Sequence, residues 1–165
     1  MAAGKSKPGE RNGRPQLTQD GYDRLQERVS DIRDRQLPEM RPLLIETERD
    51  ERIVAEFERL IEEAAVIDAL LAQADVISIS AEDLANGISL GMRAQVTLED
   101  GSMEWVRPVH PDEGFLDEER ISATSPLALA LMGASVGDTV MVQAPTGEWP
   151  CTVVEISLDG VAAVA

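Results

Sequence analysis

The sequence has few of the residues that build disulfides, metal centres or nucleophilic sites. It contains one cysteine, Cys151, and one histidine, His110. A single cysteine cannot form an internal disulfide, which fits a protein kept in a reducing compartment. His110 has no second histidine or cysteine with which to share a metal ion. We therefore predict neither a disulfide nor a metal site in the isolated protein.

Long apolar runs and common catalytic motifs are also missing. No apolar stretch approaches the roughly 20 residues that a membrane-spanning helix needs. The first residues, Met1 to Lys5, lack the apolar region of a secretory signal. The sequence has no phosphate-binding loop, dinucleotide-binding glycine pattern or catalytic triad. We expect a cytoplasmic protein without membrane contacts, without catalytic residues or a cofactor of its own, and not an enzyme by itself.

Basic residues are scarce in the second half of the chain. The sequence has 15 Lys and Arg against 31 Asp and Glu, a net charge of −16, and after residue 75 the only basic residues are Arg93, Arg107 and Arg120. Such a charge repels phosphates and argues against autonomous binding to duplex DNA. The acidic half is explained either by solubility alone or by docking onto a basic protein surface.

The clearest pattern in the sequence is a heptad seam between residues 53 and 71. Its apolar positions alternate at spacings of four and three, at Ile53, Phe57, Leu60, Ala64, Ile67 and Leu71. This spacing places six side chains on one stripe of a helix, which requires a partner helix. An upstream run repeats the spacing and slips once, at Leu25, Val29, Ile32, Leu37, Met40 and Leu44. Together the two runs predict an antiparallel helical hairpin.

The first arm of this hairpin has a recognisable start and an irregular middle. Thr18 is a plausible helix N-cap. Pro38 and Pro42 each remove a backbone donor, so they predict a bend or a short restart where the seam slips. The turn between the arms is expected within residues 46–52, which contain no glycine or proline.

The segments on either side of the hairpin differ in character. Residues 1–15 are basic and rich in glycine and proline, and we predict a disordered tail there. The hairpin is assigned to residues 16–75. Residues 76–165 show short alternating strands, an expected strand pair at 94–98 and 103–107, and a short helix at 127–132. The fold class is therefore α+β, with a helical coiled-coil hairpin followed by an antiparallel sheet domain.

Several stretches resemble the Gre family of bacterial transcription factors. The opening Leu17-Thr18-x-x-Gly21-x-x-x-Leu25 and the step Pro38-Glu39-Met40 are similar to that family's first helix. Ile121 to Gly133 resembles its C-terminal signature, as do Val136-Gly137-Asp138 and Ala144-Pro145-x-Gly147-Glu148. The resemblance covers almost everything after the tail, and the C-terminal motifs are specific in combination.

The resemblance implies a particular architecture and mode of action. Gre proteins combine an N-terminal coiled coil with a C-terminal domain of FKBP-like fold. That domain docks on the rim of the RNA polymerase secondary channel, which implies a docking role here for Ser125, Pro126 and Leu127. The coiled coil carries acidic tip residues to the polymerase, where they help to hold a second Mg²⁺ for transcript cleavage. The FKBP-like fold alone does not predict prolyl isomerase activity.

This sequence departs from the family at the hairpin tip, where that chemistry takes place. The matching region has no Gly-Asp-Leu and no Glu-Asn-Ala, and the hairpin is shorter by roughly nine residues across both arms, about 6–7 Å of helical rise. The acids available at the tip are Glu46, Glu48, Asp50 and Glu51, with Arg49 and Arg52 beside them. We consider a charged plug first, a solvated turn second and a metal-binding tip third.

Three functional hypotheses follow. In the first, a monomer binds RNA polymerase at the secondary channel and inhibits transcription without efficient cleavage. In the second, the protein stimulates transcript cleavage and rescues backtracked polymerase, with Mg²⁺ of the polymerase active site as the relevant metal. In the third, the coiled coil binds some other protein.

Overall fold

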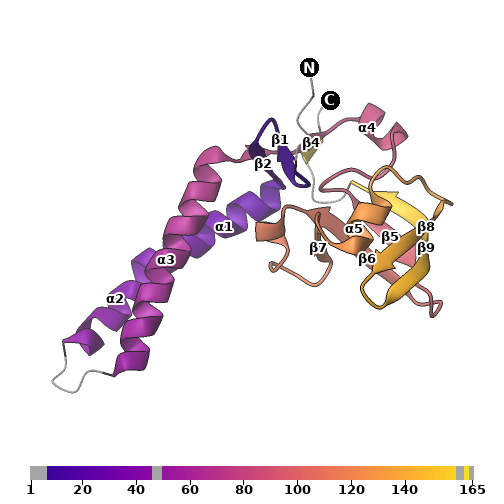
Figure 1. Cartoon of the computed structure of the whole chain (residues 1–165). Helices are drawn as coiled ribbons and strands as arrows, with labels where there is room; N and C mark the ends of the chain where they lie inside the picture. Colours follow the sequence, from indigo (N-terminus) through magenta and orange to yellow (C-terminus); the bar gives the residue numbers. More distant parts are fainter. Residues whose placement is uncertain (1–6, 46–49, 159–161, 164–165) are drawn as a thin grey trace. The chain divides into compact units, whose positions relative to one another are not determined.

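The computed structural model describes residues 7–45, 50–158 and 162–163. It comprises two compact units, which we describe separately (Figure 1). Unit 1 combines Met1–Gly21 with Asp75–Ala165, and unit 2 is Tyr22–Ala74. The predicted α+β class, a helical hairpin followed by a sheet domain, is confirmed. Among the described residues, no helix has the length and apolar character needed to cross a membrane.

Unit 2 is the predicted helical hairpin. Its first arm is a continuous run of four helical segments, and its second arm is one long helix. The segments are α1 (Gln19–Asp31), the π-helix η1 (Ile32–Gln36), α2 (Leu37–Met40), the 3-10 helix η2 (Arg41–Leu44) and α3 (Glu51–Gln73). The first three residues of α1 belong to unit 1. The apolar seam predicted from the sequence is the core of this unit, where the buried residues are Leu25, Val29, Ile32, Leu60, Ala64 and Ile67.

The irregular middle of the first arm is a π-helical turn. The amide of Leu37 donates to the carbonyl of Ile32, an i to i+5 bond in place of the usual i to i+4 bond. The π turn therefore contains one extra residue, which accounts for the slip of the apolar seam between Ile32 and Leu37. Pro38 and Pro42 lie in the first turns of α2 and η2, so a new helical segment begins at each proline, as the predicted short restart requires.

Ion pairs join the two arms of unit 2. Arg28 binds Glu63 in a bidentate pair with N–O distances of 2.7 and 3.1 Å. Arg33 binds Asp68 further along the same arms. The guanidinium of Arg28 lowers the pKa of Glu63 below its ordinary value, with a smaller contribution from Arg59. Pairs this exposed add little free energy, so the apolar seam is the main source of stability.

Unit 1 is built on a five-stranded sheet in the order β7-β6-β5-β9-β8. The strands are β5 (Arg93–Thr97), β6 (Met103–Val109), β7 (Arg120–Ser122), β8 (Thr139–Ala144) and β9 (Gly147–Ser157). The expected β5–β6 hairpin is present, with Ala94 opposite Val106. The sheet is not wholly antiparallel as predicted, because β7 pairs with β6 in parallel after a crossover that contains the 3-10 helix η3 (Pro111–Glu113).

The core of unit 1 lies between this sheet and the short helix α5 (Pro126–Leu131). It is formed by Ile88, Ala94, Val96, Val106, Leu131, Ala134, Val142, Cys151 and Val153. A second helix, α4 (Ala81–Ala85), was not predicted, although Ser80-x-x-Asp83 is a capping-box pattern. Unit 1 also contains the short strands β3 (Asp75–Val76), β4 (Ser78–Ile79) and β10 (Ala162–Ala163), the last of which pairs with β4.

The predicted disordered tail over residues 1–15 is wrong for the part that the structure describes. Residues 10–17 form a hairpin of β1 (Glu10–Arg11) and β2 (Arg14–Leu17), joined by Asn12 and Gly13. Both turn residues have positive φ, 53° and 75°, the requirement of a tight hairpin turn. This β1–β2 hairpin is held in place because β2 pairs with β3 and Leu17 is fully buried. Residues 16–21 thus belong to unit 1, which contains the sheet, and not to the helical hairpin of unit 2.

Candidate functional site

The predicted docking residues lie at the start of α5. Ser125 is the N-cap of this helix, and its hydroxyl accepts a hydrogen bond from the Ala128 amide at 3.3 Å. Pro126 occupies the first helical position and is exposed, whereas Leu127 is half-buried against the core. Of the three predicted residues, Pro126 therefore offers the most surface to a partner. Ser125 has a structural role that would be needed with or without one.

An exposed apolar surface continues from Pro126 along α5 and across β8. Leu129, Met132 and Met141 are 55%, 40% and 51% exposed. Pro126, Leu129 and Met141, with Ala130 and Gln143, line a shallow groove of about 320 Å³. We call Pro126, Leu129, Met132 and Met141 the docking face. Sequence reasoning identified only the first, although the helical spacing from Pro126 to Leu129 and Met132, and the alternation of Met141 with buried Val142, could have pointed to the others.

The three arginines that follow residue 75 are all engaged within unit 1. Arg93 binds Glu119 through two hydrogen bonds of 2.7 and 2.5 Å, and its guanidinium lies 4.1 Å from the centroid of the Trp105 ring. Arg107 is buried and donates to the Gly91 carbonyl at 2.8 Å, and burial, then the nearby Arg120, lowers its pKa. Because these cations are engaged inside the unit, its exposed charges after residue 75 are mainly carboxylates, which favours a basic partner surface.

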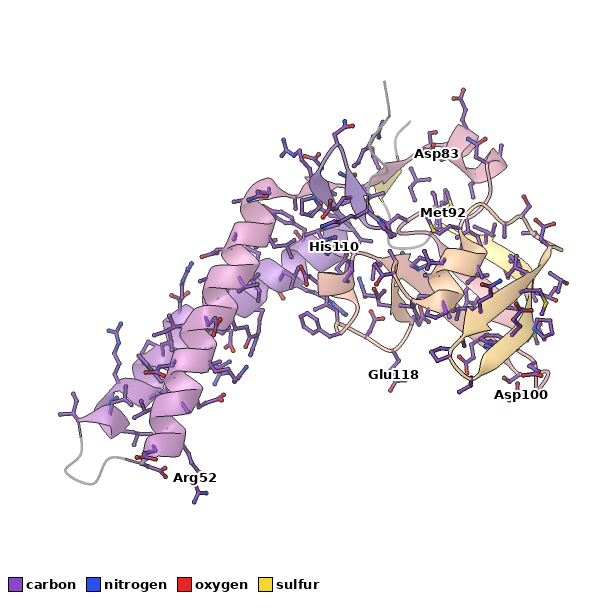
Figure 2. All side chains as sticks on the ribbon, in the orientation of Figure 1. Arg52, Asp83, Met92, Asp100, His110 and Glu118 are labelled. Carbon is purple, nitrogen blue, oxygen red and sulfur yellow. The ribbon has the colours of Figure 1, made fainter. Side chains whose placement is uncertain are left out.

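Only half of the predicted tip can be described. Glu46 and Glu48 lie outside the described residues. Asp50 is the N-cap of α3, and its carboxylate accepts the Arg52 amide at 2.9 Å, while Glu51 is exposed in the first helical turn. Figure 2 shows Arg52 at this end of the hairpin. One tip carboxylate is thus already engaged at the start of its own helix, next to a cation.

The other residues considered from the sequence have structural environments. His110 is almost buried, and its Nδ1 accepts a hydrogen bond from the Asp112 amide at 3.1 Å, which caps η3. Cys151 is fully buried, and burial raises the pKa of its thiol. Within the described residues, no group of three or more His, Cys, Asp or Glu side chains is arranged to hold a metal ion.

Comparison with known proteins gives a consistent set of relatives. A family model described as "Transcription elongation factor, GreA/GreB, C-term" matches residues 86–158. Transcription elongation factor GreA of Thermotoga neapolitana is 30% identical over 151 residues, covering 86% of this chain and 96% of that protein. GreA of Sinorhizobium medicae is 33% identical over 145 residues, covering 79% and 89%. Among solved structures, the GreA factor homolog 1 (Gfh1) protein of Thermus thermophilus is 27% identical over 86% of this chain and 97% of that one, with a TM-score of 0.39.

Proposed function

The chain belongs to the GreA/GreB family of transcription elongation factors, and from this premise we propose that it binds bacterial RNA polymerase at the secondary channel and inhibits transcription without efficient transcript cleavage. In this proposal the docking face contacts the channel rim and the hairpin enters the channel. The protein acts as a plug and contributes no catalytic group of its own.

The docking part of the proposal is supported by the exposed apolar surface on α5 and β8. Three exposed apolar residues around one groove, with Met132 exposed at the end of the same helix, on a unit with many exposed carboxylates suit a partner surface that is apolar at its centre and basic at its edge. Met141→Arg should weaken binding to RNA polymerase by at least about tenfold, since a charge would be placed at a desolvated contact.

The matched control for this substitution is Met103→Arg. Met103 is 61% exposed at the start of β6, which lies three strands from β8 in the sheet order. The same charge introduced there should leave binding within about twofold. Equal loss of binding in both variants, measured by pull-down and by titration with core polymerase, would show that net charge and not the docking face controls the interaction.

The plug hypothesis is supported by the described half of the tip. The cap hydrogen bond to Oδ1 fixes the Asp50 carboxylate against the start of its own helix, and the positive charge of Arg52, two residues on, disfavours a further cation nearby. Charge can still contribute to blocking the channel. Replacing all four tip acids with their amides should therefore change inhibition without abolishing binding. Asn is as good an N-cap as Asp, so the helix start is preserved at position 50.

One experiment separates this proposal from its alternatives. The protein is added to RNA polymerase in a run-off assay and to a backtracked complex in a cleavage assay. Reduced run-off product with an uncleaved transcript supports the plug. Cleavage of the backtracked transcript establishes the alternative, a cleavage-stimulating elongation factor. Failure to bind polymerase at all leaves the third hypothesis, a coiled-coil module for another protein.

A further inference from the structure

The start of helix α1 is capped by two residues that lie far apart in the sequence. Thr18 is its N-cap, and the Thr18 hydroxyl accepts the Gly21 amide at 3.0 Å. The carboxylate of Glu113 accepts the Thr18 amide at 3.0 Å and also binds the Thr18 hydroxyl. All of these residues belong to unit 1, and both Thr18 and Glu113 are fully buried.

This arrangement has the hydrogen bonds of a capping box with one member supplied by another part of the chain. In a capping box, the N-cap hydroxyl accepts the N3 amide, and the N3 side chain accepts the N-cap amide. Helix α4 of the same unit has the usual form, in which Ser80 and Asp83 bond each other with distances of 3.3 and 2.7 Å. In α1 the N3 residue is glycine, and Glu113 takes the place of its side chain.

Position 21 must be glycine because the carboxylate of Glu113 occupies the place of an N3 side chain. A Cβ atom at Gly21 would overlap the carboxylate of Glu113. A side chain at position 21 would therefore occupy the space that Glu113 now fills. Glu113 can therefore cap α1 only because residue 21 has no side chain.

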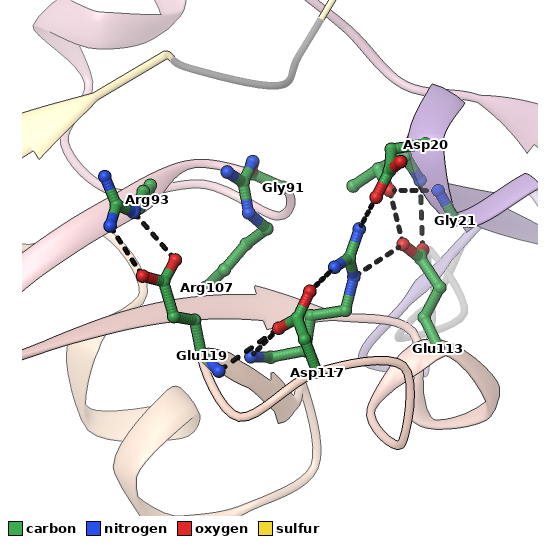
Figure 3. A network of polar contacts seen from close by, with 10 residues as sticks. Asp20, Gly21, Gly91, Arg93, Arg107, Glu113, Asp117 and Glu119 are labelled. Carbon is green, nitrogen blue, oxygen red and sulfur yellow. Dashed lines mark hydrogen bonds and ion pairs between the residues drawn. The ribbon is translucent and has the colours of Figure 1, made fainter. Parts of the chain in front are cut away.

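The carboxylate of Glu113 is itself held by a buried arginine, Arg120, within a polar network in which Figure 3 shows Glu113 beside Asp20 and Gly21. Arg120 lies 3.4 Å from Glu113, binds Asp20 in the first turn of α1 at 2.6 Å, and binds Asp117. Arg120 is only 8% exposed and Glu113 is inaccessible to solvent. Because a buried charge is stabilised only by its partners, removing Arg120 would leave Glu113 without this cation, whereas removing Glu113 would leave Arg120 paired with Asp20 and Asp117.

We propose that Glu113 completes the capping box of helix α1 from 95 residues further along the sequence, so that the first arm of the hairpin begins as a helix only when unit 1 is folded around it. The first three residues of α1 belong to unit 1 and the remaining ten to unit 2. Helix formation in the first arm therefore depends, through the continuous backbone of α1, on the crossover segment that contains Glu113.

The test transfers the carboxylate from position 113 to position 21. Three variants of the full chain are compared with the parent protein: Glu113→Ala, Gly21→Glu, and both together. Amide hydrogen exchange is measured by mass spectrometry on peptides from α1, α4 and β9. Loss of a capping interaction of 0.5–2 kcal/mol corresponds to roughly twofold to thirtyfold faster exchange, which we expect in α1 for Glu113→Ala. The Gly21→Glu variant alone should also show faster exchange in α1, because the new side chain would overlap Glu113.

The double variant decides the question, because Glu at position 21 can accept the Thr18 amide once Glu113 has been removed. Exchange in α1 should return most of the way to the parent value. If the double variant exchanges as fast as the two single changes combined, position 21 cannot replace Glu113 and the proposal is overturned. Unchanged exchange in α1 for Glu113→Ala would overturn it as well.

Two controls separate local capping from general destabilisation. Glu118→Ala removes an exposed carboxylate from the same crossover and should leave α1 unchanged. Asp83→Ala breaks the local capping box of α4 and should accelerate exchange there and not in α1. Should Glu113→Ala fail to fold, Glu113→Gln keeps the volume and one acceptor oxygen, and it should produce a smaller effect at the same place. Uniform acceleration of α1, α4 and β9 in Glu113→Gln would refute the proposal.

Discussion

The hairpin should depend strongly on Leu60, at the centre of the seam between its arms. Leu60 is 1% exposed, whereas its neighbour Ile61 is 47% exposed on the same helix. Leu60→Ala removes about three methylene equivalents, worth roughly 2.4 kcal/mol at 0.8 kcal/mol each, and leaves a cavity whose further cost depends on how far the neighbours collapse. A hairpin of only two helical arms can partly close such a cavity, so we expect a loss of about 2.5–3.5 kcal/mol.

Ile61→Ala is the matched control, because it removes a side chain of the same size one residue along. About half of that side chain is already in water, and alanine is the better helix former, so the expected loss is below about 1 kcal/mol. Urea unfolding followed by circular dichroism at 222 nm reports mainly the helices of unit 2. The fluorescence of Trp105 and Trp149 reports unit 1, which contains both tryptophans.

The outcome to look for is a large shift of the dichroism transition for Leu60→Ala and a small one for Ile61→Ala. A loss below about 1 kcal/mol for Leu60→Ala, or an equal loss in the two variants, would refute the assignment of the seam as the main stabilising contact of the hairpin.

Three further predictions concern charges, turns and the N-terminal hairpin. The pKa of Asp31 is lowered to about 2, first by the hydrogen bonds from Arg35, so its contribution to stability is present above its ordinary value near 3.8 and is lost as pH falls through 2. NMR titration should find that midpoint, and Arg35→Ala should raise it. Gly87→Ala should cost at least about 2 kcal/mol and Gly101→Ala about 1 kcal/mol in thermal unfolding, since both have positive φ but only at Gly87 would a Cβ overlap neighbouring backbone. Deleting residues 1–15 should lower the urea midpoint seen by tryptophan fluorescence, since the part of β2 that pairs with β3, Gln16 and Leu17, would lose the support of strand β1 and of the Arg14–Asp75 ion pair; an unchanged midpoint would mean that the β1–β2 hairpin contributes nothing to unit 1.

The sequence alone predicts those elements in which a hydrophobic pattern is repeated over many residues. The heptad spacing of Leu60, Ala64 and Ile67 identified the buried face of α3, because one stripe of a helix must be covered. Strands with clear alternation were also predicted, and the expected pairing of β5 with β6 is present. In both cases a short stretch of sequence contains the whole signal.

Features that depend on distant residues could not be predicted in this way. The pairing of β2 with β3 joins residues about 60 positions apart, so the local composition of the basic segment before it predicts a tail instead. The Asn12-Gly13 turn was a local signal that could have corrected this interpretation. The role of Glu113 has no local signal, since it becomes a cap only when the crossover meets Thr18.

The candidate site was predicted in outline only. The motif around Ser125 predicted helix α5, but the exposure of Leu129 and Met141 depends on which faces of α5 and β8 the core covers. At the tip, the sequence offered four acids as equivalent candidates. The structure distinguishes Asp50 from the exposed Glu51, because the start of α3 engages the Asp50 side chain.

The π-helical turn has a consequence for how the first arm can vary between related proteins. Its extra residue is accommodated between Ile32 and Leu37, so deleting one residue from this segment would leave an ordinary α-helix with the apolar stripe continuous on both sides. Length changes of a single residue elsewhere in the arm would rotate everything beyond them by about 100°. A deletion of one residue is therefore best tolerated at this turn, and residue counts along the first arm do not translate directly into distance.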